Sequence, residues 1–175
     1  MQKNAFSIQP FEARRVRVES ARSFEEVLFN LQKKVGKTTI PQAQGSVPTR
    51  EQFEHAIQQE VGESGFTLFF EMNYGHWLPL FGIQCKVVRW ILGNPLIAIT
   101  MIRHDITASL FAPVELLLLE NESGHGSTVI YDQPSSLMVI EPNPALLAAA
   151  RVLDHKLARL VSRVTGVELN QTEEQ

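Results

Sequence analysis

GNPLIAITMIRHDITASLFAPVELLLLE, residues 93–120, is the most apolar stretch of the chain, yet it carries polar groups that a plain core segment would lack. Asn94 is a favourable helix N-cap, and Pro95 would then occupy the first helical position. The β-branched residues of 96–102 instead favour a strand. The residues themselves leave both readings open, whereas the apolar run 114–120 predicts a strand.

The flanking sequence predicts an α+β protein. Alternating or short apolar runs predict further strands at 13–19, 65–73, 86–92 and 127–132. Capping residues followed by apolar residues at helical spacing predict helices at 24–35, 50–61 and 144–165. Gly36 is expected to end the first helix, and residues 133–141 are expected to form a turn and a short apolar piece. The order predicts an antiparallel sheet of four or five strands, covered by helices on one face, with a long C-terminal helix.

The chain of 175 residues fits a single domain, expected to span residues 13–166. Residues 1–12 are expected to form a flexible arm, and the polar residues 167–175 a frayed tail. Within the domain, residues 37–61 are expected to form a surface loop followed by an inserted helix.

The composition excludes several classes of function. The formal net charge is -3, so no basic surface indicates nucleic acid or an anionic membrane. A single cysteine allows no intramolecular disulfide and excludes a zinc site built from cysteines. The first residues lack the apolar core of a secretory signal, and every apolar run is far shorter than the roughly 20 residues that span a bilayer. We expect a soluble, cytoplasmic protein without membrane insertion.

Eight residues are candidates for binding a small molecule. They lie in the irregular segment 74–82 and in or beside the apolar stretch: Tyr74, His76, Trp77, Asn94, Arg103, His104, Asp105 and Glu115. A helix that begins after Asn94 could offer backbone N–H groups to an anion, and the neighbouring aromatic side chains suit an acidic or aromatic ligand. No pattern identifies the ligand or a cofactor.

The histidines allow other readings. His104 or His76 could act as general acid or base on a small substrate. The same side chains could bind haem or a metal ion, but no histidine stands at the spacing of a helical zinc motif, and no metal site is predicted. In a structural alternative, Asp105 caps a turn. Arg103 then pairs with one of two carboxylates, Glu115 or Glu120.

Three segments resemble the domain of unknown function 302 family, in a branch similar to its eukaryotic members. They are GNPLIAITMIRHD at 93–105, LFAPVELLLLE at 110–120 and STVIYDQPSS at 127–136. The resemblance runs from about Val16 to Gly166. It implies a curved antiparallel sheet like that of the TATA-binding protein, a helix directly after the Gly-Asn-Pro turn, and pairing into a homodimer.

The chain departs from the family pattern in two places. An Asp-His pair of the family is Gly75-His76 here, so the resemblance carries no acid partner for the histidine. The helix at 50–61 looks like an insertion relative to shorter bacterial members. The family has no agreed activity, and we expect a small-molecule-binding or scaffold homodimer rather than an enzyme.

Overall fold

The computed structural model describes residues 6–37, 49–122 and 124–169. Its strands are β1 (Arg15–Ser20), β2 (Gly36–Lys37), β3 (Thr67–Asn73), β4 (Val87–Gly93), β5 (Val114–Glu120) and β6 (Ser127–Asp132). Its α-helices are α1 (Phe24–Lys34), α2 (Arg50–Glu60), α3 (Pro95–Ile102), α4 (Pro134–Met138) and α5 (Pro144–Thr165). Short 3-10 helices are η1 (Tyr74–His76), η2 (Leu78–Phe81) and η3 (Ile106–Phe111). The α+β class and the long C-terminal helix are confirmed. Parts of the expected arm, loop and tail (1–5, 38–48 and 170–175) lie outside the described residues.

The sheet is mixed, with six strands in the order β1-β6-β5-β4-β3-β2, so the expected purely antiparallel sheet of four or five strands is wrong. Every neighbouring pair is antiparallel except β2, which runs parallel to the first two residues of β3. A Cβ on Gly36 would lie 1.8 Å from the backbone oxygen of Glu60, so this approach requires glycine. Helix α1 ends at Lys34, and Val35 follows as an extended C-cap, so the helix stops just before the expected Gly36, whose φ is not positive.

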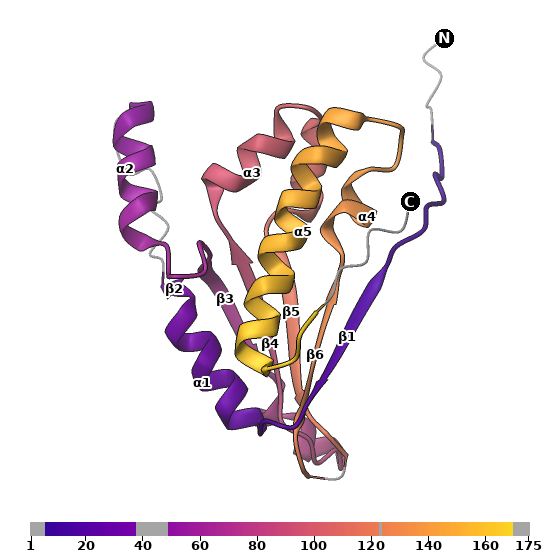
Figure 1. The fold of residues 1–175 in the computed structure, drawn as a ribbon. Helices are drawn as coiled ribbons and strands as arrows, with labels where there is room; N and C mark the ends of the chain where they lie inside the picture. The colour runs from indigo at the N-terminus through magenta and orange to yellow at the C-terminus, as the bar shows by residue number, and fades with distance from the viewer. Residues whose placement is uncertain (1–5, 38–48, 123, 170–175) are drawn as a thin grey trace.

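Helices α1 and α5 lie side by side on one face of the sheet (Figure 1). Both begin at the predicted caps: Ser23 and Glu26 form a capping box on α1, and the side chain of Asn143 accepts a hydrogen bond from the N–H of Leu146 on α5. Helix α5 ends at Gly166, whose φ of 75° is left-handed. These local signals position the two helices that cover the core.

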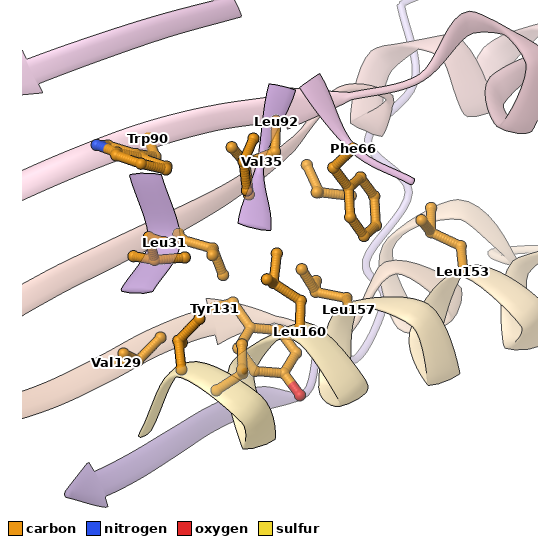
Figure 2. Packing of buried hydrophobic residues seen from close by; sticks show 14 of the residues in the cluster. Leu31, Val35, Phe66, Trp90, Leu92, Val129, Tyr131, Leu153, Leu157 and Leu160 are labelled. Atoms are coloured by element: carbon orange, nitrogen blue, oxygen red, sulfur yellow. The ribbon is translucent and has the colours of Figure 1, made fainter. Parts of the chain in front are cut away.

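The core fills the space between the sheet and these helices, and Figure 2 shows it from Trp90 and Val129 at one end to Leu153 at the other. Apolar residues of α1, β4, β6 and α5 interdigitate there. Trp90 is 2% exposed, and its Nε1 finds no hydrogen-bond acceptor among the described residues. Among the described side chains, this indole N–H is a buried polar group that the fold leaves unsatisfied.

The ambiguous central stretch is helical where the family resemblance indicated. Asn94 caps α3, and Asp105 caps η3 by accepting a hydrogen bond from the N–H of Thr107 at 2.8 Å. The expected turn at 133–136 is wrong, because Pro134 opens α4 in the first helical position. Five residues are too few to show a helical period in a sequence, so this helix carried no readable signal.

Strand β3 does not alternate as the sequence predicts. A β-bulge between Leu68 and Phe70 shifts its register against β4, so Phe70 pairs with Ile91. Phe70 is 50% exposed as a result. The bulge places an aromatic side chain on the face of the sheet that α1 and α5 do not cover.

Candidate functional site

A groove of about 730 Å³ lies on the face of the sheet opposite to α1 and α5. The buried residues of β4 point toward the helices, and the alternate residue Arg89 points toward this open face. Strand pairing sets Arg89 beside Leu117 of β5, and Leu117 beside Ile130 of β6. Because paired residues share a face, these three side chains form one row across the floor of the groove.

The walls of the groove come from elements at the ends of the strands. Leu110 and Phe111 of η3 line one part, and Pro134 and Leu137 of α4 line another. Tyr74 of η1 contributes a phenolic hydroxyl at the rim. Elements far apart in the sequence thus form a concave surface, with Leu117, Ile130 and the charged Arg89 on its floor and aromatic and aliphatic side chains on its walls.

Two arginine–carboxylate pairs supply the charged groups of the groove. Arg89 donates from Nε and Nη2 to one carboxylate oxygen of Glu115, at 2.9 and 2.5 Å. Arg15 of β1 binds both oxygens of Asp132 in β6, at 2.7 and 3.0 Å. Glu115, and after it the hydroxyl of Tyr74, raise the pKa of Arg89, and Asp132 does the same for Arg15. Both guanidinium groups therefore stay charged.

The formal charges of the groove cancel. Its lining contains two arginines, Arg15 and Arg89, and two carboxylates, Glu115 and Asp132. A ligand with a net charge would meet no uncompensated partner and would have to disrupt an ion pair. Spare guanidinium N–H groups and carboxylate lone pairs can still donate to and accept from a neutral polar group. The lining suits an uncharged molecule with an apolar body.

The aromatic candidates of segment 74–82 divide between the groove and the surface. Tyr74 lines the groove, and its ring centroid lies 5.6 Å from that of Trp77. Trp77 also meets Phe81 edge-on at 6.1 Å and is 43% exposed. His76 is exposed and does not line the groove. Of these residues, only Tyr74 lies where a groove ligand could touch it.

Asn94 lies at the opposite end of β4 from Tyr74, because Asn73 pairs with Val88 whereas Asn94 follows Gly93. The structure therefore does not bring Asn94 together with Tyr74, His76 and Trp77. The expected anion site at the start of α3 is also wrong. Within the first turn, Pro95 has no N–H, and the next three N–H groups all donate to Asn94, through its side chain or its backbone oxygen.

The triplet at 103–105 forms a corner between α3 and η3, outside the groove. Arg103 donates from Nε to the backbone oxygen of Ile99 and does not pair with Glu115 or Glu120, so that expectation is wrong. Those carboxylates bind Arg89 and Lys86 instead. Asp105 caps η3, and hydrogen bonds from Thr107 lower the pKa of its carboxyl group.

The two candidate histidines do not share a site. His104 is exposed at the α3–η3 corner, where its backbone oxygen accepts from the side chain of Asn143, and His76 is exposed in η1. Within 6–37, 49–122 and 124–169, no three His, Cys, Asp or Glu side chains converge as a metal site would need. Over the same ranges, no helix has the length and apolar character to cross a membrane.

Sequence reasoning found Tyr74 and Glu115 but missed Arg15, Arg89 and Asp132. Each of the three looks like an ordinary polar residue on an alternating strand. Their convergence depends on which strands pair and in which register, and that information is not local.

Comparisons with known proteins give the family. The family model described as "Domain of unknown function DUF302" matches residues 45–164, which include α2 but begin well after the expected Val16. One similar solved structure is an uncharacterized conserved DUF302 protein from Bacillus stearothermophilus, 17% identical, with a TM-score of 0.60. The match covers 86% of this chain and 97% of that one, and at this identity it shows the fold alone. No curated protein matches the chain. With well over half of its length matched, the chain belongs to the DUF302 family.

Proposed function

We propose that the chain is a small-molecule-binding domain whose groove takes an uncharged molecule with both apolar and polar parts. The observation that carries this proposal is the groove itself, which at about 730 Å³ has the size of a ligand site. Ligand sites commonly combine apolar walls with a few polar groups that fix orientation. The groove has this combination.

The apolar part of the ligand would lie on the row formed by Leu117 and Ile130. Both side chains are only half-buried, so covering them removes apolar surface from water. Leu110 is 79% exposed, so a ligand in the groove would remove a large part of its apolar surface from water. An exposed leucine beside a concave apolar surface is the side chain that we expect to close on the ligand.

The polar part of the ligand would face the two ion pairs. Arg15 directs two N–H groups at Asp132. Arg89 directs two at Glu115 and also hydrogen-bonds the hydroxyl of Tyr74. A guanidinium has five N–H groups, so each arginine keeps N–H directions for a ligand. An amide, hydroxyl or ring carbonyl can accept from these donors without breaking an ion pair. The Tyr74 hydroxyl, which also interacts with Arg89, adds a polar group to the same lining.

We also propose a cytoplasmic homodimer with a curved sheet like that of the TATA-binding protein. The family resemblance supports the sheet geometry and the pairing, and the composition supports the location. The open face offers a surface for pairing beside the groove: Phe70 of β3, Met72 of β3, Val87 of β4 and Ile91 of β4. These residues would form the apolar centre of a contact between two copies.

Acid–base catalysis and haem or metal binding have weaker support. Both hypotheses require His76 or His104, and both side chains are exposed and separate from the groove. A general base needs a pocket in which a substrate can be positioned against it. We therefore place binding ahead of both alternatives.

Nile red tests the proposal, because this probe is flat, uncharged and brighter in apolar surroundings. We expect saturable fluorescence enhancement with the full chain, and about fivefold or more weaker binding in Leu110→Glu, because a carboxylate there would be desolvated by the ligand. Ile106→Glu is the matched control: Ile106 belongs to the same helix η3, is 70% exposed and does not line the groove.

Tyr74→Phe refines the same measurement. It removes one hydroxyl from the groove and should weaken a ligand that binds this polar group, whereas Trp77→Phe should not, since Trp77 lies outside the lining. Non-saturable enhancement, or equal losses in Leu110→Glu and Ile106→Glu, would show that the groove is not the binding site.

A further inference from the structure

A second cavity, of about 240 Å³, lies between α3, β4 and α5. Its inner wall is built from Phe66, Leu92, Met101 and Leu153, all of them buried. Phe66, Leu92 and Leu153 belong to the same core cluster (Figure 2). Toward the surface the cavity is bounded by less buried residues, among them the exposed Pro113. It is an extension of the core that reaches solvent.

The lining of this cavity is apolar and carries no charge. Asn94 has the only polar side chain among the lining residues, and both ends of its amide are occupied. Its Nδ2 donates to the backbone oxygen of Gly65 at 3.0 Å, and its Oδ1 accepts from the N–H of Leu96 at 2.8 Å. The N–H groups of Ile97 and Ala98 are bound to the backbone oxygen of Asn94. Neither an ion nor a water cluster would find partners there.

The shape of the cavity depends on Gly93. A Cβ at this position would lie 2.4 Å from Cε2 of Phe69 and 3.2 Å from Cβ of Pro113. Its φ is not positive, so the glycine serves the close approach of the Phe69 ring and not a special backbone conformation. The absent side chain lets the Phe69 ring lie across β4 as one wall of the cavity. The Gly-Asn-Pro motif therefore shapes an apolar cavity. Gly93 forms its floor, and Asn94 caps α3 by accepting hydrogen bonds from the N–H groups of the first turn.

From these observations we propose that the cavity beneath α3 is a binding site for a small uncharged aromatic or aliphatic molecule. Apolar cavities of about 150 Å³ stay dry and accept benzene. At about 240 Å³ this cavity has room for one or two fused rings. The site is distinct from the groove on the open sheet face, because its inner wall is on the helix-covered side of the sheet, and only Pro113 and Val114 line both.

Indole is a suitable probe, measured with the full chain by calorimetry and by ligand-observed NMR. We expect saturable binding, and about tenfold or more weaker binding in Ala98→Leu, since the larger side chain occupies the cavity. Thr100→Leu is the matched control on the same helix, because Thr100 is exposed and does not line the cavity. Ala112→Leu, from the opposite side of the cavity, should also block binding and covers the case in which Ala98→Leu does not fold.

The charge of the probe provides a second criterion. Indole-3-carboxylate should not compete, because no free N–H in the first turn of α3 can receive its carboxylate. The proposal would be overturned if indole did not bind, or if it bound equally to wild type, Ala98→Leu and Ala112→Leu. Efficient competition by the carboxylate would overturn it as well. Nile red binding in the groove should be the same in Ala98→Leu and wild type, so the two sites can fail independently.

Discussion

The carboxylate of Asp154, in the middle of α5, accepts a hydrogen bond of 2.9 Å from the backbone N–H of Ser135 at the start of α4. Asp154 is 2% exposed and Ser135 is 9% exposed. The other carboxylate oxygen accepts from Nε2 of Gln133 at 3.0 Å. A buried carboxylate thus holds α4 against α5, and α4 in turn forms one wall of the groove.

We expect Asp154→Ala to lower the free energy of unfolding by about 2–3 kcal/mol, because the buried N–H of Ser135 and the half-buried amide of Gln133 lose a charged acceptor. Asp154→Asn keeps one acceptor oxygen and should cost less. Urea unfolding followed by circular dichroism measures both. Arg151→Ala, on the exposed side of the same helix, should change stability by less than about 0.5 kcal/mol. Equal effects of Asp154→Ala and Arg151→Ala would show that the buried carboxylate does not fix α4.

Stability should fall at high pH because of Tyr131. Burial, and next the charge of Asp154, raise the pKa of Tyr131 from 10.0 to about 12. Above pH 10 the unfolded chain loses this proton while the folded chain keeps it, so the folded state binds more protons and the stability contributed by Tyr131 is lost between pH 10 and about 12. The loss should reach roughly 2–3 kcal/mol.

Urea unfolding of wild type and Tyr131→Phe, below pH 10 and near pH 12, isolates this effect from lysine titration. We expect wild type to lose more stability than the variant. Parallel losses would mean that Tyr131 ionises equally in the folded and unfolded states.

Gly36→Ala should be strongly destabilising. A Cβ would lie 1.8 Å from the oxygen of Glu60 and 2.6 Å from the nitrogen of Gly62, and both are backbone atoms that cannot rotate away. We expect a loss of about 3 kcal/mol or more, or roughly 6–12 °C in Tm, measured by calorimetry. In Gly82→Ala the new Cβ meets nothing within 4 Å, but the φ of 76° costs about 1 kcal/mol. A smaller loss in Gly36→Ala than in Gly82→Ala would contradict the close pairing of β2.

The proposed homodimer can be tested with two exposed phenylalanines. Phe70 lies on the open sheet face and is 50% exposed, and Phe29 lies on α1 and is 54% exposed. We expect light scattering after gel filtration to show a dimer for wild type and for Phe29→Lys, and a monomer for Phe70→Lys, since a buried unpaired lysine is costly at the centre of an interface. A monomeric wild type would end the dimer proposal. A dimeric Phe70→Lys would move the interface to another surface.

The sequence predicts the parts of this fold that depend on neighbouring residues. The capping boxes at Ser23 and Thr49 and the cap at Asn143 give the starts of three helices, because each is a contact within one turn. The start of α3 carries an equally clear signal at Asn94, but the β-branched residues after it compete. Only the family resemblance decided between the two readings.

Features made by distant contacts are not predicted. Strand β2 has two residues and exists because Gly36 can approach the chain near Glu60. The groove depends on register, which sets Arg15 beside Asp132 although 117 positions separate them. The proposed anion site fails for the opposite reason. Asn94 satisfies the helix donors so completely that no N–H remains for a ligand, and a cap motif does not reveal this by itself.

The two tryptophans lie in different environments, so their intrinsic fluorescence can report on two parts of the molecule separately. Trp77 is 43% exposed and packs against Tyr74, whereas Trp90 is buried in the core and its indole N–H has no hydrogen-bond partner among the described residues. Emission from Trp90 should be blue-shifted and shielded from dissolved iodide, and emission from Trp77 should be red-shifted and quenched. Quenching would therefore follow the η1–η2 segment at the rim of the groove, while the protected signal would follow the integrity of the core, in one unlabelled sample.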